Sequence, residues 1–212
     1  DLDVAESHMR AGQALAEPSG DVEYRVSVNL ILARLRSARG DLRGALQAVD
    51  QIDQLLKASE SPTSLRAHVA ATGVEVALSS GSLAEAEHWA ARMSPEAGGH
   101  PFYRHLNLVW PRLLLARGDR RAASEVLHPL YTTATDAGWE WGAIAVRIWQ
   151  AVTAESQQAG LTFLKDALHR GAPERFIRTF VDAGPAIVPL LKEAERQGVA
   201  PEYVGRVLQA IS

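Results

Sequence analysis

Apolar residues recur along most of this chain at intervals of three and four positions, which is the spacing of one face of an α-helix. The segments that show this spacing are rich in Ala, Leu, Glu and Arg, all good helix formers. Sustained two-residue alternation and Asn-Gly or Asp-Gly hairpin turns do not occur in the sequence. The pattern therefore predicts an all-α chain.

Three segments of the chain repeat one another: 30–52, 71–93 and 108–130. Each contains a helical run, a glycine, and a second helical run with a small residue five places after the glycine. The turn glycines are Gly40, Gly81 and Gly118, and the small residues are Ala45, Ala86 and Ala123. This arrangement predicts a helix hairpin in which the small residue lets the two helices approach closely.

The turn chemistry supports the hairpin. A glycine can adopt the positive φ that ends the first helix, and Asp41, Ser82 or Asp119 can cap the second one. A fourth, degenerate unit places Glu155 where the glycine should stand, so the anchors at 40, 81, 118 and 155 are separated by 41, 37 and 37 residues. The period and the Gly-Asp-x-x-x-Ala turn resemble a slightly lengthened tetratricopeptide (TPR) repeat of about 34 residues.

The tripeptide Arg-Gly-Asp, which occurs at 39–41 and again at 117–119, has a second interpretation as an integrin ligand. That role requires an exposed loop on a secreted protein, and no signal peptide opens the chain. The helix joint explains the glycine, the aspartate and the downstream alanine together, so we favour it.

The predicted architecture is a TPR-like, right-handed α-solenoid of about four hairpins with a helical cap. We expect repeats over 1–172, beginning with a half-unit at 2–17, and capping helices over 173–212. Loops are predicted at 18–21, 58–63 and 94–101. Pro111 and Pro129 lie inside predicted helices and should kink or break them.

The tail of the chain carries a family resemblance. The residues concerned are Phe176, Arg178, Phe180, Asp182, Gly184, Pro185, Leu190, Leu191, Pro201, Tyr203 and Val204. They resemble the segment that closes the TPR-like sensor region of MalT-type regulators, the large ATP-binding transcriptional activators of the LuxR type. The family's Asp-Glu-Gly-Pro reads Asp-Ala-Gly-Pro here, with Ala183 in place of Glu.

The resemblance implies a sensor region that binds an inducer or a regulatory partner and so controls an ATP-bound, self-associating activator. The ATP-binding motif Gly-x-x-x-x-Gly-Lys-Ser/Thr does not occur in the sequence. The chain begins at Asp1 rather than Met and ends where the family's linker and helix-turn-helix domain would follow. We therefore expect a fragment of a longer regulator.

Composition narrows the possible partners. The chain has 22% charged and 47% hydrophobic residues. Its net charge of −3 shows none of the excess of Lys and Arg that is typical of nucleic-acid-binding domains. The chain has no cysteine, and no apolar run reaches the roughly 18 residues of a membrane span. We expect a cytoplasmic protein that binds neither DNA nor a membrane through this region.

No enzymatic motif stands out. The seven histidines form no His-x-x-x-His pair for a metal, and neither a Gly-x-Ser-x-Gly nor a Gly-x-Gly-x-x-Gly motif is present. We expect no catalysis, no metal and no cofactor.

A binding groove is the better hypothesis. In a TPR-type solenoid the first helix of each hairpin lines the concave face, and the position six residues before each turn should point toward it. That position holds Arg34, Glu75, Arg112 and Trp149, while His68 and His105 stand seven residues before two of them. Guanidinium groups and an aromatic plate suit a polar, sugar-like or peptide ligand. Alternatively, these are solvated positions at which Arg34, Glu75 and Arg112 pair as salt bridges.

Three tryptophans lie close together in the segment 138–149. Trp139 and Trp141 are two positions apart near a helix start, so they should point to different sides of the helix. We expect one in the core and one exposed, which makes this the best place for an aromatic-lined pocket.

Two hypotheses for function remain open. One is a sensor for a small-molecule inducer or a regulatory protein, with possible self-association of the parent. The other is a TPR-type scaffold whose groove binds a peptide without any small effector. A closed pocket near the tryptophans would favour the sensor, and an open groove would favour the scaffold.

Overall fold

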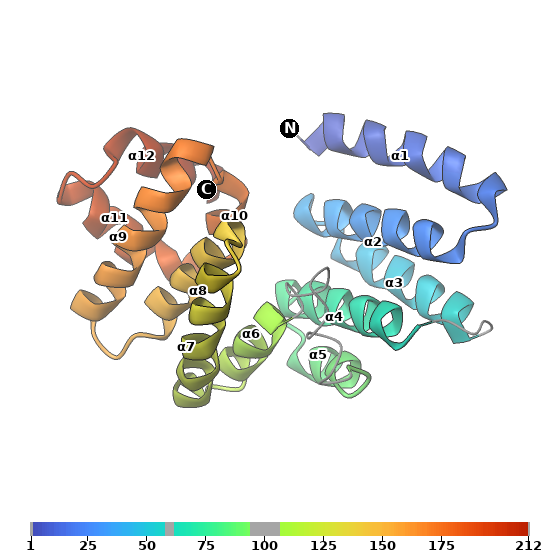
Figure 1. Cartoon of the computed structure of the whole chain (residues 1–212), viewed down its shortest axis with the longest axis horizontal. Coiled ribbons are helices and arrows are strands. Elements are labelled where there is room, and N and C mark those ends of the chain that lie inside the picture. Colours follow the sequence, from blue (N-terminus) through green and yellow to red (C-terminus); the bar gives the residue numbers. More distant parts are fainter. Residues whose placement is uncertain (1, 58–61, 94–106, 212) are drawn as a thin grey trace. The chain divides into compact units, whose positions relative to one another are not determined.

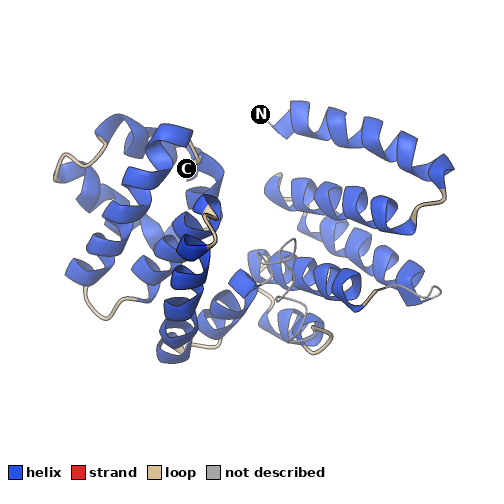
Figure 2. Cartoon of the chain, in the orientation of Figure 1, coloured by secondary structure: helices blue, strands red, loops and turns tan. Residues whose placement is uncertain are grey.

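The computed structural model describes residues 2–57, 62–93 and 107–211, and every regular element within them is a helix (Figure 2). The described residues form two compact units, divided between Val109 and Trp110. The predicted all-α fold of consecutive helix hairpins is confirmed. The handedness of the solenoid stays a prediction.

In its described residues the first unit has five α-helices, which follow one another in space as they do in sequence (Figure 1). Each helix packs against the next, and α2 also contacts α4, the first helix of the following hairpin. The elements are α1 (Leu2–Ser19), α2 (Val22–Ala38), α3 (Leu42–Lys57), α4 (Thr63–Ser79) and α5 (Leu83–Ala90).

The second unit contains the remaining helices. Its helix α8 packs between α7 and α9, and the last short helices cover α8 and α9. The elements are α6 (Val109–Ala116), α7 (Arg120–Asp136), α8 (Glu140–Thr153), α9 (Gln157–Glu174), α10 (Ile177–Val181), the 3-10 helix η3 (Gly184–Ile187), α11 (Val188–Arg196) and α12 (Pro201–Ile211).

The three predicted glycine turns are present and share one geometry. Gly40 and Gly118 have φ of +83° and +82°, and the residue after each donates a backbone hydrogen bond five residues back, as in a Schellman motif. Asp41 and Asp119 then cap the second helix, each accepting from a backbone N–H at 2.9 Å. Ser82 makes no such side-chain bond at the third turn.

The small residues after these turns are fully buried. Ala45, Ala86 and Ala123 are each 0% exposed, as expected for positions where the two helices of a hairpin approach closely. A side chain larger than alanine at this position would push the two helices apart.

The degenerate fourth joint forms without a glycine. Ala154 leaves α8 in an extended conformation with φ −58° and ψ 142°, and Ser156 is also extended. The Ser156 hydroxyl then accepts a hydrogen bond from the Ala159 backbone N–H and starts α9. Glu155 therefore occupies a joint that needs no left-handed residue.

The tail of the chain is helical, as expected, and prolines stand at the starts of its helices. Gly184 has φ +67° after α10 and is followed by Pro185 in the first turn of η3, and Pro201 is the first residue of α12. These helices share one core with α8 and α9, in which Phe180 and Val204 are fully buried. The predicted boundary between repeats and cap at 172/173 stays a prediction.

Some predicted boundaries and breaks differ from the structure. Helix α1 continues through Pro18 to Ser19, so the loop expected at 18–21 is shorter. Helix α7 continues through Pro129, and Pro111 lies in the first turn of α6, where a missing N–H does not matter. Most of the loop expected at 58–63 and all of the loop expected at 94–101 lie outside the described residues.

Candidate functional site

Two of the four groove positions meet in the first unit. Arg34 on α2 donates from Nε to Glu75 Oε2 on α4 at 3.1 Å, and its Nη1 lies 3.5 Å from His68 Nε2. The Arg34 and Glu75 side chains are 32% and 23% exposed, so the pair lies partly inside the protein. His68 is 7% exposed and lies on α4 two turns before Glu75.

The other two groove positions meet in the second unit. The Arg112 guanidinium on α6 lies over the Trp149 ring on α8, 5.4 Å from its centroid. Both side chains are half-buried. A guanidinium over an indole is an attractive cation–π contact.

The structure therefore brings the predicted ladder together as two pairs, one in each unit. Arg34 and Glu75 form the salt bridge that the alternative interpretation expects, whereas Arg112 contacts an aromatic ring. Ligand binding by these residues stays a prediction. His105 lies outside the described residues.

The tryptophans at the start of α8 pack against each other. The Trp139 and Trp141 rings are 5.4 Å apart, and Trp139 covers Gly142 so closely that a Cβ there would lie 2.2 Å from the ring. Trp141 is 37% exposed, and its Nε1 donates to Thr179 Oγ1 at 3.1 Å. The expected division holds in a weaker form, because Trp139 is half-buried rather than part of the core.

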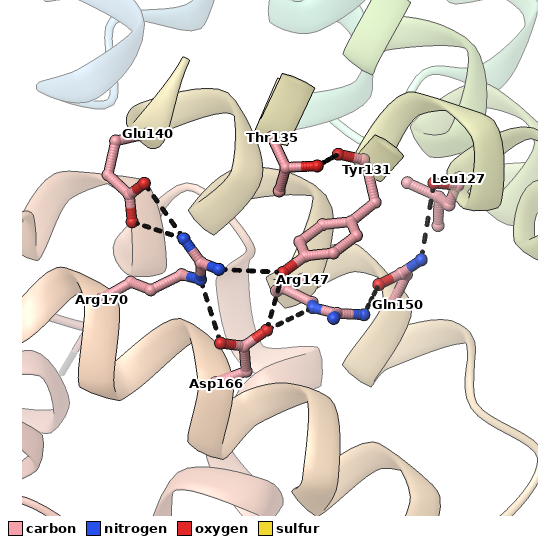
Figure 3. Close-up of polar contacts among 8 residues, drawn as sticks. All are labelled: Leu127, Tyr131, Thr135, Glu140, Arg147, Gln150, Asp166 and Arg170. Atoms are coloured by element: carbon pink, nitrogen blue, oxygen red, sulfur yellow. Dashed lines mark hydrogen bonds and ion pairs between the residues drawn. The ribbon is translucent and has the colours of Figure 1, made fainter. Parts of the chain in front are cut away.

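A polar network not predicted from the sequence connects α7, α8 and α9, with Asp166 at its centre (Figure 3). Asp166 accepts hydrogen bonds from Arg147 Nε at 2.6 Å, from Arg170 Nε at 3.0 Å and from the Tyr131 hydroxyl at 3.1 Å. One carboxylate thus joins residues of three helices.

Both arginines of this network make further contacts. The guanidinium carbon of Arg147 lies 3.4 Å from the centroid of the Tyr131 ring. Arg147 also donates a hydrogen bond to the side-chain oxygen of Gln150, and the Gln150 amide in turn donates to the Leu127 carbonyl. Arg170 donates to both oxygens of Glu140, at 2.9 and 3.1 Å, and to the Tyr131 hydroxyl. These hydrogen bonds and ion pairs hold α7, α8 and α9 together.

The electrostatics of the network follow from these contacts. Burial alone would raise the pKa of Asp166, but the hydrogen bonds from Arg147, Arg170 and Tyr131 outweigh it and lower that pKa below its ordinary value. Hydrogen bonding to Glu140 raises the pKa of Arg170, and Asp166 adds to this against the opposing effect of burial. Asp166 and Arg170 are therefore both charged at neutral pH.

A sequence signal for part of this network exists. Asp166 and Arg170 are four positions apart on one helix, a spacing at which opposite charges pair. The contacts of Tyr131 and Arg147 join different helices, and counting back from the turn glycines does not reach them.

A surface hollow of about 350 Å³ lies at the α8–α9 joint. Arg120 lines it and donates to the carbonyl of Val152, near the end of α8, and to that of Ala154, the residue after the helix. None of the predicted groove residues that the structure describes, and none of the clustered tryptophans, lines this hollow.

Among the described residues, no group of three or more His, Asp or Glu side chains is placed to hold a metal ion. No helix in the described ranges is long and apolar enough to cross a membrane.

Comparison with known proteins identifies the family. The family model described as the MalT-like TPR region matches residues 1–197, which is most of the chain. A comparison with curated proteins gave no match. Together with the helix hairpins joined at Gly40, Gly81 and Gly118, this match shows that the chain belongs to the family of MalT-like TPR regions.

Proposed function

We propose that this chain is the sensing region of a LuxR-type, MalT-like transcriptional activator, in which an inducer or a regulatory protein binds the faces of the first helices of the hairpins. The family match over residues 1–197 carries the proposal, because TPR-like regions serve as binding platforms. The bound state would shift the parent protein toward its active form.

The groove residues support a binding role by their chemistry. Arg112 over Trp149 places a hydrogen-bond donor beside an aromatic plate on two neighbouring first helices. A polar ligand with an apolar face could stack on the indole and accept hydrogen bonds from the guanidinium. A peptide scaffold without a small effector is the competing function.

Isothermal titration calorimetry tests the proposal. Sugars and other small metabolites are titrated into the chain, and each compound that binds is tested again with Arg112→Ala and Trp149→Ala. We expect each substitution to weaken binding at least tenfold. Arg121→Ala serves as the matched control, because Arg121 is 91% exposed on α7 and pairs only with a neighbouring turn through Glu125.

Two outcomes contradict the proposal. If no compound binds and the full-length parent protein keeps its inducer response with both substitutions, the groove does not sense the inducer. If only peptides bind the chain, the scaffold function replaces the sensor.

A further inference from the structure

The surface hollow at the α8–α9 joint is built from three parts of the second unit. Its lining comes from Arg120, the first residue of α7, from residues of the segment 151–157, and from Leu190 of α11. Its volume of about 350 Å³ lies at the lower end of the range of small-molecule sites, roughly 300–1,000 Å³. The hollow therefore suits a small metabolite.

The Arg120 guanidinium is held beside the hollow by the backbone of the joint. Its Nη1 donates to the Val152 carbonyl at 2.5 Å and to the Ala154 carbonyl at 3.4 Å. Among the described residues, no group accepts a hydrogen bond from its Nε or Nη2. These two atoms form one edge of the guanidinium, and such an edge binds a carboxylate through two parallel hydrogen bonds. Arg120 therefore has a carboxylate-binding edge that the fold does not use.

A side chain of opposite charge lines the same hollow. Glu155, between α8 and α9, is exposed, and its carboxylate makes no hydrogen bond or ion pair with another residue that the structure describes. Arg120 reaches the carbonyl of Ala154, the residue before Glu155, yet no ion pair joins Arg120 to Glu155. The hollow is thus lined by two opposite charges that do not neutralise each other directly.

Apolar side chains complete part of the lining. Ala151 is 3% exposed, Leu190 is 9% exposed, and Val152 is half-buried. Gly160 brings α9 close to this region, because a Cβ there would lie 2.8 Å from the Ala151 carbonyl oxygen and 3.2 Å from Leu190 Cδ1. A short aliphatic group placed against these side chains would leave water, which favours its binding.

We propose that this hollow binds a free α-amino acid with a short aliphatic side chain. The ligand carboxylate accepts two hydrogen bonds from Nε and Nη2 of Arg120, the ligand ammonium group donates to the Glu155 carboxylate, and the aliphatic side chain covers Leu190. An α-amino acid carries both charges in one small molecule, whereas a simple carboxylate or amine satisfies only one of the two side chains. None of the groove residues that the structure describes lines the hollow, so this site goes beyond the proposed function.

Nuclear magnetic resonance of the arginine side chains tests the site in the whole chain. The probe is L-valine, titrated at constant pH and ionic strength while the Arg120 Nε–Hε signal is followed. L-Valinamide keeps the ammonium group but lacks the carboxylate, and 3-methylbutanoate keeps the carboxylate but lacks the ammonium group. We expect L-valine to shift the Arg120 signal in a saturable way and each analogue to bind at least tenfold more weakly.

Substitutions separate the two charges, and isothermal titration calorimetry measures their affinities. Glu155→Gln should weaken L-valine binding at least fivefold without weakening 3-methylbutanoate binding, because only the ammonium group loses its partner. Arg120→Lys keeps the positive charge but has no fork, so it should also weaken L-valine binding at least fivefold. The matched controls Glu202→Gln and Arg206→Gln, at exposed positions of α12, should leave the affinity unchanged.

Thermal melting shows which variants keep the fold. Arg120 contacts two backbone carbonyls, so Arg120→Lys can disturb the joint, whereas the Glu155 carboxylate has no contact to lose within the described part of the chain. Glu155→Gln therefore keeps the test decisive by itself.

Three results overturn this site. They are a wild-type Arg120 signal that L-valine does not move, an analogue with a single charge that binds as tightly as L-valine, and equal affinity of Glu155→Gln and the wild type for L-valine. Arg112→Ala and Trp149→Ala, which test the groove, should leave L-valine binding unchanged. The two proposals therefore fail separately.

Discussion

At the scale of single residues, two tyrosines of the second unit differ in the hydrogen bonding of their hydroxyl groups. The Tyr131 hydroxyl donates to Asp166 and accepts from Arg170. The Tyr203 hydroxyl is buried and has no hydrogen-bond partner among the described residues, and burial raises the pKa of Tyr203 to about 12. A buried polar group without a partner costs free energy.

Removal of each hydroxyl should therefore change stability in opposite directions. We expect Tyr203→Phe to raise the free energy of unfolding by about 1 kcal/mol, because the ring keeps its edge contact with Phe180 and loses only the hydroxyl. Tyr131→Phe should lower it by about 1 kcal/mol. Urea unfolding of both variants measures the difference, and equal effects would show that the Tyr203 hydroxyl finds a partner in solution.

The charge of Asp166 gives the stability a pH dependence. Its pKa is lower in the folded chain than the ordinary value of 3.8, so its ionised form stabilises the fold above that pH. The stabilisation is lost as the pH falls through the lowered pKa. We expect Asp166→Asn to cost about 1–2 kcal/mol at pH 7 and progressively less below pH 4, as urea unfolding at a series of pH values would measure.

The control for this prediction is Asp182→Asn. Asp182 forms an exposed i,i+4 pair with Arg178, and such pairs contribute little. A cost of Asp166→Asn that stays constant from pH 7 to pH 3 would contradict the prediction.

At the scale of the helices, the joints of the hairpins depend on backbone conformation more than on contacts. Gly118 has φ +82°, and a Cβ placed there would meet no atom within 4 Å. The glycine is needed for its backbone angle alone. Gly205, in contrast, lies within α12, where glycine only weakens a helix.

The same substitution should thus have opposite effects at these two glycines. We expect Gly118→Ala to lower the free energy of unfolding by about 1 kcal/mol, because alanine is strained at positive φ. Gly205→Ala should raise it by about 0.5–1 kcal/mol, since the new methyl group meets no closer atom than Glu195 Oε1 at 3.9 Å. Chemical denaturation followed by circular dichroism compares the free energies of unfolding of the two variants. A Gly118→Ala variant more stable than the wild type would contradict the prediction that alanine is strained at this turn.

These joints also explain how far the sequence predicts the fold. Gly40 and Gly118 mark turns because few residues other than glycine adopt positive φ, so the repeat can be found by counting. The joint at Glu155 uses extended residues that any sequence can adopt, and only its spacing indicates it. Local backbone chemistry is therefore predictable.

Contacts between distant side chains are much less predictable. The position of Arg34 in its repeat identifies its neighbour Glu75, 41 residues later, because both count six back from a glycine. Tyr131 and Asp166 meet across two helices whose relative rotation depends on the packing of the whole unit. Without that rotation, the sequence cannot show which charged residues share a face.

At the scale of the whole chain, the polar contacts divide by the helices that carry them. In the first unit, Arg34 and Glu75 join two first helices of successive hairpins. In the second unit, Asp166 joins α9 to α7 and α8 and accepts three hydrogen bonds. A carboxylate such as Asp166, which is engaged by side chains of three helices, suits a structural role.

The division of the described residues into two compact units predicts that each loses protection from hydrogen exchange by itself. Leu164 in α9 and Leu56 in α3 are almost completely buried, so truncation of either to alanine should cost about 3 kcal/mol. We expect Leu164→Ala to lower the protection of amides in 110–212 and leave the first unit unchanged. Leu56→Ala should do the reverse. Hydrogen exchange followed by mass spectrometry separates the two regions, and an equal loss across both from either substitution would mean that the chain unfolds as one cooperative body.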